Sequence, residues 1–143
     1  MNKPTFDDLV QKFMRGGNCA QAVLGSVADD LGYDTEETDK MGACFGGGMM
    51  RGETCGAVTG AMMAIGLACD TPAEAMEKAN RFQMAFAEKY GSTMCRDLLG
   101  YDLADQAQRE QAKASGEMLV FCPQAVLAAI DILEEVLETG KGG

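Results

Sequence analysis

The sequence feature that most constrains the fold is a run of sixteen residues, 54–69, without a single charged side chain. A helix that has no polar face must be buried on all sides or lie within a membrane. Sixteen residues, three of which are glycine, fall short of the ~20 apolar residues that a bilayer-spanning helix requires. We therefore expect a central helix at about 54–69, surrounded by the rest of the protein.

Small residues recur along this expected helix at every fourth position. They are Gly56, Gly60, Ala64 and Ala68. Residues four apart share one face of a helix, so these positions form a narrow ridge that a neighbouring helix backbone can approach closely. The pattern predicts tight helix–helix packing on this side of the central helix.

Helix start and stop signals occur throughout the rest of the chain. Asn18, with Gln21 three residues later, has the form of a capping box, and Thr71 before Pro72 is a typical helix start. Together with apolar residues at helical spacing, such signals predict helices at about 5–15, 18–31, 34–44, 54–69, 71–90, 92–99 and 102–115, and a last one that starts at Pro123. The polar helix at 102–115 is expected to face solvent.

The sequence contains no internal repeat, low-complexity tract or interdomain linker. We expect one all-α domain, residues 1–143, in which six to eight helices form a compact bundle around the central helix. In the helix that runs to Tyr90, the residues Met76, Phe82 and Phe86 are predicted to face the core. The end of the chain, 139–143, is expected to be a flexible tail.

The charge of the chain argues against several partners. With 12 basic and 22 acidic residues the net charge is −10, and no stretch is basic enough to bind nucleic acid or an anionic membrane surface. We also expect no direct membrane insertion. The N-terminal residues lack the basic and apolar segments of a secretory signal, so the sequence predicts a cytoplasmic protein. Permanent disulfides are rare in that compartment, which favours redox, catalytic or metal-binding roles for the six cysteines; filling of small core positions is the alternative.

The chain contains no histidine. This excludes Ser-His and Cys-His nucleophile pairs, HExxH zinc sites and imidazole general bases. Any catalytic chemistry must therefore use thiols, carboxylates, lysine, arginine or tyrosine.

A glycine-dense stretch from Cys44 to Gly60, CFGGGMMRGETCGAVTG, leads into the central helix. Glycine at this density indicates unusual backbone conformations or a close approach of the backbone to a ligand. The pattern comes near a phosphate-binding P-loop, but Glu53 stands where that loop needs lysine, and no strand precedes it. We therefore interpret the stretch as a binding loop for another group. Its candidate binding residues are Gly46, Gly47, Gly48, Arg51 and Gly56.

The six cysteines divide into two groups by their place on the expected helices. The first group, at or within a first helical turn, comprises Cys19, Cys55, Cys95 and Cys122. The second group, at helix ends, comprises Cys44 and Cys69. Free backbone N–H groups and the helix dipole favour a thiolate at a helix start, which lowers the pKa of a cysteine there. Cys55 is the strongest candidate nucleophile, because Gly56 leaves its sulfur poorly shielded and Arg51 could add a positive charge.

Around these cysteines the chain resembles the C_GCAxxG_C_C family, small redox-active proteins named for a CGAxxG motif and a set of four cysteines. The motif stands here as Cys55-Gly-Ala-Val-Thr-Gly60. The other matching segments are Asn18-Cys-Ala-Gln-Ala-Val23, Cys95-Arg-Asp-Leu-Leu-Gly100 and Cys122. The resemblance covers nearly the whole chain. It implies a redox function without an assigned substrate, for a protein often encoded near transporter genes. A similar segment in some multihaem cytochromes is associated with an iron–sulfur centre.

Three functions remain open from the sequence. The first is a thiol-based oxidoreductase in which Cys55 attacks as a thiolate and one of the other first-turn cysteines resolves the mixed disulfide. The second is a four-cysteine centre that holds an iron–sulfur cluster or zinc. The third is a helical binding module with structural cysteines. The corresponding partners are a redox protein or a membrane transporter component, and an acidic, Met-rich bundle is also compatible with a homodimer. The extra thiols of Cys44 and Cys69 leave any disulfide pairing ambiguous.

Overall fold

The uncharged run forms helix α4 (Gly56–Ala68) in the computed structural model, which describes residues 3–138. The first half of α4 is buried on nearly every side, whereas Gly66 near its C-terminal end is exposed. The predicted position of the central helix is therefore confirmed. Its burial on all sides holds only for the half nearest its N-terminus.

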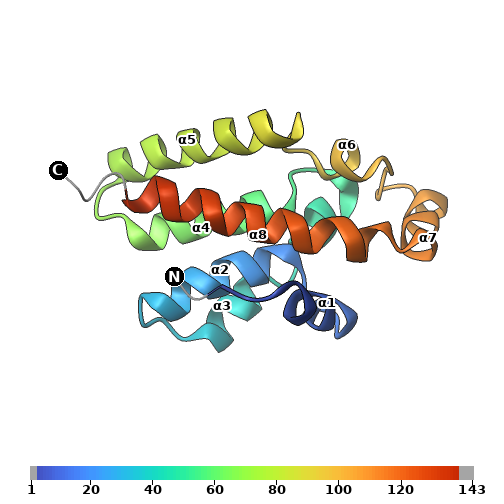
Figure 1. The fold of residues 1–143 in the computed structure, drawn as a ribbon, viewed down its shortest axis with the longest axis horizontal. Helices are drawn as coiled ribbons and strands as arrows, with labels where there is room; N and C mark the ends of the chain where they lie inside the picture. The colour runs from blue at the N-terminus through green and yellow to red at the C-terminus, as the bar shows by residue number, and fades with distance from the viewer. Residues whose placement is uncertain (1–2, 139–143) are drawn as a thin grey trace.

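Seven further α-helices surround α4 in the described part of the chain (Figure 1). They are α1 (Phe6–Met14), α2 (Cys19–Asp30), α3 (Thr35–Met41), α5 (Pro72–Tyr90), α6 (Cys95–Leu99), α7 (Gln106–Ser115) and α8 (Glu117–Glu138). Within residues 3–138, the only extended pairing is a single antiparallel bridge between Thr54 and Met94. The prediction of an all-α bundle is thus confirmed. The predicted tail, 139–143, lies outside the described residues.

The helices are arranged so that several of their N-termini meet at one end of the molecule. Helices α2, α4 and α8 run in the same direction, and they begin at the end where α6 and α7 lie (Figure 1). Helix α5 runs in the opposite direction along one side of α4 and α8, and α1 to α3 lie on the other side. Cysteines at the starts of different helices can therefore meet at this one end.

Helix α2 packs closely against α4 along the predicted ridge of small residues. A methyl group added to Gly60 would lie 2.6 Å from the carbonyl oxygen of Ala20, and one added to Gly56 would lie 3.1 Å from the Cβ atom of Cys19. Both distances are shorter than ordinary van der Waals contact. Glycine at these positions therefore lets the two helices touch, as the four-residue spacing predicts.

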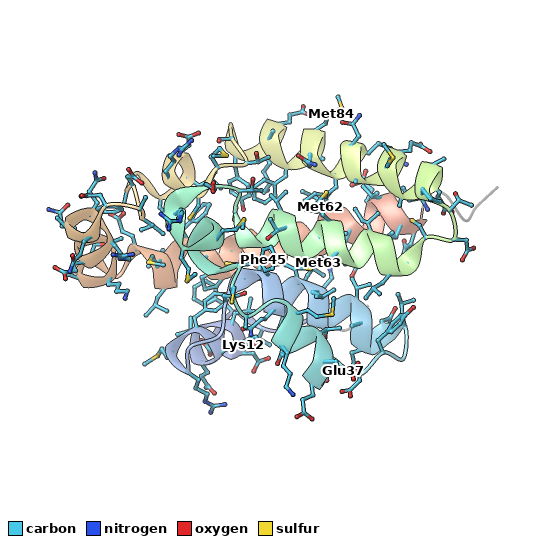
Figure 2. The ribbon with its side chains drawn as sticks, turned by 180° about the vertical axis from the view of Figure 1, so that it is seen from behind. Lys12, Glu37, Phe45, Met62, Met63 and Met84 are labelled. Carbon is cyan, nitrogen blue, oxygen red and sulfur yellow. The ribbon has the colours of Figure 1, made fainter. Side chains whose placement is uncertain are left out.

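Another side of α4 packs against α5. Met62 lies between the two helices, where the side-chain amide of Gln83 donates a hydrogen bond to its sulfur at 3.4 Å (Figure 2). Met84, on the outer face of α5, points away from the bundle (Figure 2). With α2 on one side and α5 on another, α4 is held at the centre of the fold.

Two of the predicted helix starts are stabilised by their own side chains. Asn18 accepts a hydrogen bond from the N–H of Gln21 at 2.9 Å, and the side chain of Gln21 accepts one from the N–H of Asn18 at 3.0 Å. The Asn18 amide also donates to the carbonyl of Gly42 at 2.9 Å, which ties the start of α2 to the end of α3. Thr71 accepts from the N–H of Glu74 at 3.2 Å at the start of α5. These predicted starts are confirmed, and each cap stabilises its helix by ~1 kcal/mol.

The predicted start of the last helix is wrong. Helix α8 begins at Glu117, before Pro123, so Cys122 lies inside the helix and not in its first turn. A proline inside a helix removes one hydrogen bond and costs ~3 kcal/mol. Packing offsets this cost here, because Phe121 contacts the core and its ring centroid lies 5.5 Å from that of Tyr90. Tertiary contacts outweigh the local signal in this part of the chain.

One of the residues predicted to face inward from α5 is exposed. Met76 is 72% exposed, whereas Phe82 and Phe86 are fully buried, as predicted. Lys78 is buried instead, and its ammonium group lies 3.0 Å from a carboxylate oxygen of Glu74. The apolar stem of a lysine can lie in a core while its charged end reaches a partner. The buried face of α5 is therefore rotated away from the position of Met76.

No single helix among the described residues is both long enough and apolar enough to cross a membrane. Helices α7 and α8 meet the length and hydropathy criteria only as a pair, and the chain bends by 82° between them. This bend places α7 across the end of the bundle (Figure 1).

Candidate functional site

A cavity of about 550 Å³ lies at the end of the bundle where α2 and α4 begin. Its wall includes all four cysteines of the predicted first-turn group, Cys19, Cys55, Cys95 and Cys122. Most of the other lining side chains are apolar, among them Leu98, Leu103 and Phe121. Cavities of this size and character are typical binding sites for small molecules.

Cys55 and Cys95 are brought together by a short backbone pairing. The pairing is an antiparallel bridge centred on Thr54 and Met94. The N–H groups of Cys55 and Cys95 donate to carbonyl groups across this bridge at 2.8 Å and 2.6 Å. Residues on either side of such a centre point to the same face. The two cysteines therefore share one face, although they are far apart in the sequence.

Cys19 and Cys122 meet where the start of α2 faces α8. Cys19 is the first residue of α2, and its thiol contacts the backbone carbonyl of Cys122 with a sulfur–oxygen distance of 4.0 Å. Gly56 makes room for this contact, because a side chain there would press on Cys19. All six cysteines of the chain are free thiols in this structure.

An interaction between the side chains of Cys19 and Cys122 shifts their pKa values in opposite directions. A hydrogen bond from the Cys19 side chain lowers the pKa of Cys122, although burial acts in the other direction. The same hydrogen bond, together with burial, raises the pKa of Cys19 well above that of a free thiol. The field at the start of α2 favours a thiolate on Cys19, but the direct contact with Cys122 outweighs it. Cys122 is therefore the member of the pair that ionises first.

The predicted lowering of the Cys55 pKa is wrong. Burial raises the pKa of Cys55 to about 11, and the backbone amides of Ala57 and Val58 offset only part of this rise. Burial likewise raises the pKa of Cys95 to about 12, with a further contribution from Cys55. Desolvation outweighs the effect of the helix start on the pKa of both of these buried thiols.

The glycine-rich stretch contains a left-handed turn, η1 (Gly48–Gly52). Four consecutive residues, 47–50, have φ values between 58° and 64°. Glycine adopts this conformation freely, but each of the two methionines in the run costs roughly 1–2 kcal/mol. A side chain at Gly48 would lie 2.5 Å from the backbone of Glu53. The predicted unusual backbone is therefore confirmed, and the turn leads directly to the start of α4.

The predicted binding residues of this stretch are divided between the cavity wall and its surroundings. Gly46, Gly47 and Gly56 line the cavity, whereas Gly48 and Arg51 do not. Arg51 is exposed, and it does not contribute to the shift in the pKa of Cys55. The backbone of the glycine-rich stretch therefore lies next to the thiols, whereas the positive charge of Arg51 lies outside the cavity.

The two remaining cysteines lie away from the cavity. Cys44 is exposed in the turn that follows α3, so it is not a packing residue. Cys69 is partly buried at the far end of α4, and burial raises its pKa. The helix-end cysteines are therefore separated in space from the four that gather at the cavity.

Two charged residues of the cavity wall are not predicted from the sequence. Arg109 and Lys113 both line the cavity, although they belong to the polar helix α7, for which only a solvent-facing role is predicted. Their spacing of four residues places them on the same face of α7. Two like charges at this spacing, in a chain with a net charge of −10, are the signal in the sequence that could have drawn attention to them.

The four thiols do not fit a metal centre as they are placed here. Among residues 3–138, no group of three or more cysteine, aspartate or glutamate side chains is arranged so that it could hold a metal ion. Zinc and iron–sulfur centres require several thiolates at about 2.3 Å from a shared metal. The donor set therefore does not match the predicted four-cysteine zinc or cluster site, and no step is assigned to a metal.

Comparison with known proteins places the chain in one family. A family model described as "Putative redox-active protein (C_GCAxxG_C_C)" matches residues 17–136, a range that includes all four cavity cysteines. No curated protein and no solved structure gives a significant match to the chain. Since the family match extends over most of the sequence, this protein belongs to the C_GCAxxG_C_C family of redox-active proteins.

Proposed function

We propose that this protein carries out thiol–disulfide exchange, with Cys122 as the attacking thiolate and Cys19 as the resolving thiol. The observation that supports this most is the closeness of the two residues, because the Cys19 thiol lies 4.0 Å from the backbone carbonyl oxygen of Cys122 and the Cys19 side chain lowers the pKa of Cys122. Both residues line the same cavity, so a small disulfide can reach both of them. Exchange requires an ionised thiol next to a second thiol that can resolve the mixed disulfide.

The reaction uses a disulfide, RSSR, as its oxidant. The thiolate of Cys122 attacks one sulfur of RSSR, which forms a bond between Cys122 and RS and releases RS⁻. Cys19 then loses its proton and attacks the sulfur of Cys122, so that the Cys19–Cys122 disulfide forms and a second RS⁻ leaves. The protons of the two protein thiols end on the two released thiols. The protein is thus oxidised by two electrons, and RSSR is reduced to 2 RSH.

Cys55 and Cys95 have a different place in this reaction. Their pKa values, raised by burial to about 11 and about 12, keep them protonated at neutral pH. A protonated thiol is a poor nucleophile, so neither competes with Cys122. The sequence predicts Cys55 as the nucleophile; the contacts around Cys122 support the reassignment of that role.

A redox titration tests the proposed exchange. The protein is equilibrated with mixtures of reduced and oxidised dithiothreitol, free thiols are blocked by alkylation, and the mass of the intact chain is measured. We expect one two-electron transition in the wild type and also in a Cys55→Ala/Cys95→Ala variant, because these two thiols take no part. Cys122→Ser should lose the transition completely. A transition that persists in Cys122→Ser, or that disappears in the double variant, would contradict the assignment.

A further inference from the structure

We infer that the cavity binds small disulfides that carry a carboxylate, and that Arg109 and Lys113 recognise this carboxylate. The inference rests on the proposed exchange reaction and names its substrate class. It starts from a contrast in charge. The chain has 22 acidic and 12 basic residues, but the charged residues that line the cavity are the two basic ones, and no aspartate or glutamate is among the lining residues.

The position of helix α7 explains how two cations reach an otherwise apolar cavity. The chain bends by 82° between α7 and α8, so α7 lies across the end of the bundle (Figure 1). Gly116, which has a φ of 74° and ends α7, makes this corner and also lines the cavity. Arg109 and Lys113, four residues apart, then face the cavity from the same side of α7.

These two cations have no partner within the part of the chain that the structure describes. Lys3, Lys12 and Lys78 form ion pairs with carboxylates among residues 3–138, but no such pair is found for Arg109 or Lys113. Arg109 is partly buried and Lys113 is exposed, so one lies deeper in the wall than the other. The guanidinium group of an arginine has the geometry to bind a carboxylate with two hydrogen bonds. A carboxylate on the ligand would therefore supply the missing partner.

The rest of the cavity wall indicates that the part of the ligand away from the carboxylate is apolar. Its wall is largely apolar, and Leu98, Leu99 and Phe121 are among the side chains that form it. A volume of about 550 Å³ lies within the range that small-molecule sites occupy. An apolar or aromatic disulfide with a carboxylate would thus place its charge on α7 and its sulfur atoms among the cysteines of the same cavity.

Two aromatic disulfides of different charge test this inference. One is 5,5′-dithiobis(2-nitrobenzoate), which carries two carboxylates, and the other is 2,2′-dithiodipyridine, which is neutral. Both release products with their own absorbance bands, so the second-order rate constant of each is measured by absorbance. All proteins carry Cys44→Ser and Cys69→Ser, because these thiols lie outside the cavity and would add their own reactions.

We expect Arg109→Gln to slow the reaction with the carboxylated disulfide by at least about tenfold, as expected for the loss of a charged hydrogen bond. Lys113→Gln should have a smaller effect, because Lys113 is the more exposed of the two. Arg109→Lys, which keeps the charge, should recover part of the rate. The rate with the neutral disulfide should stay within about twofold of the parent protein in all three variants. Lys40→Gln is the matched control for Lys113→Gln. Both lysines lie in the last turn of a helix, but Lys40 does not line the cavity.

The outcomes separate this inference from the proposed exchange. If Arg109→Gln slows both disulfides equally, or slows neither, the carboxylate is not recognised by α7 and the inference is wrong. If the parent protein does not react with the neutral disulfide at Cys122, the exchange reaction itself is wrong. In that case binding of 4-nitrobenzoate to the Cys122→Ser protein still decides the present inference, because Arg109→Gln must weaken this binding if α7 holds the carboxylate.

Discussion

Replacing Cys19 by alanine should slow the alkylation of Cys122 at neutral pH and stop the exchange reaction after its first step. The hydrogen bond from Cys19 lowers the pKa of Cys122, so its loss should raise that pKa and leave less thiolate. A smaller thiolate fraction at pH 7 then lowers the alkylation rate of Cys122. Without a resolving thiol, the substrate stays bound to Cys122 as a mixed disulfide. Peptide-level mass spectrometry of iodoacetamide labelling, measured as a function of pH, gives the rate at Cys122 alone.

Cys19→Ser is the matched control for this experiment. Serine keeps a hydroxyl donor at the first position of α2 but cannot form a disulfide. The alkylation rate of Cys122 should therefore stay close to that of the wild type, while the mixed disulfide still accumulates. Equal pH profiles for the alanine variant and the wild type would show that Cys19 does not tune Cys122, against the direction derived from their contact.

Gly60→Ala should lower the free energy of unfolding by about 2 kcal/mol. The added methyl group would lie 2.6 Å from the carbonyl oxygen and 2.9 Å from the Cα atom of Ala20, so α2 and α4 must separate. Overpacking of this kind costs up to about 3 kcal/mol, of which the better helix propensity of alanine returns about 1 kcal/mol. Because Ala20 follows Cys19, the displacement should also weaken the contact between Cys19 and Cys122. Denaturant unfolding followed by circular dichroism measures the loss of stability.

Gly66→Ala provides the comparison within the same helix. A methyl group at Gly66 meets nothing within 4 Å, and the residue is exposed. Only helix propensity changes there, so this variant should be more stable than the wild type by about 1 kcal/mol. If the two substitutions changed stability by the same amount, the close approach of α2 at Gly60 would not be a packing constraint.

The parts of the fold that follow from local chemistry are predictable from the sequence. Asn18 with Gln21, and Thr71 before Pro72, start helices where the capping rules place them, because a cap needs only the neighbouring backbone. The four-residue spacing of Gly56 and Gly60 likewise predicts a close contact with a neighbouring helix, because the spacing alone defines a helix face; the structure shows that this helix is α2.

The parts that depend on tertiary contacts are not predictable in the same way. Pro123 is a good local signal for a helix start. However, α8 begins earlier, at Glu117, and the packing of Phe121 stabilises this additional part of the helix. Cys55 is placed at a helix start, as predicted, yet the surrounding core removes water from its thiol and raises its pKa to about 11. Burial of an individual atom depends on every element packed around it, and a pattern in one helix does not contain this information.

The candidate site shows the same division between local and tertiary information. The sequence predicts the set of four cysteines that lines the cavity, and Cys19, Cys55 and Cys95 lie at helix starts as expected. Cys122 reaches the cavity from inside α8. The sequence predicts neither the pairing of Cys19 with Cys122 nor the approach of Arg109 to the cavity, because both depend on where α8 begins and on the 82° bend between α7 and α8.

The most direct test of the proposed reaction is the identity of the first disulfide that forms. The reduced native protein is treated with one equivalent of a small disulfide, remaining thiols are alkylated, and the digested chain is mapped by mass spectrometry without reduction. We predict a linked peptide that joins Cys19 to Cys122, with Cys55 and Cys95 alkylated. A first disulfide that contains Cys55 or Cys95 would contradict the assignment of Cys122 and Cys19 as the reacting pair.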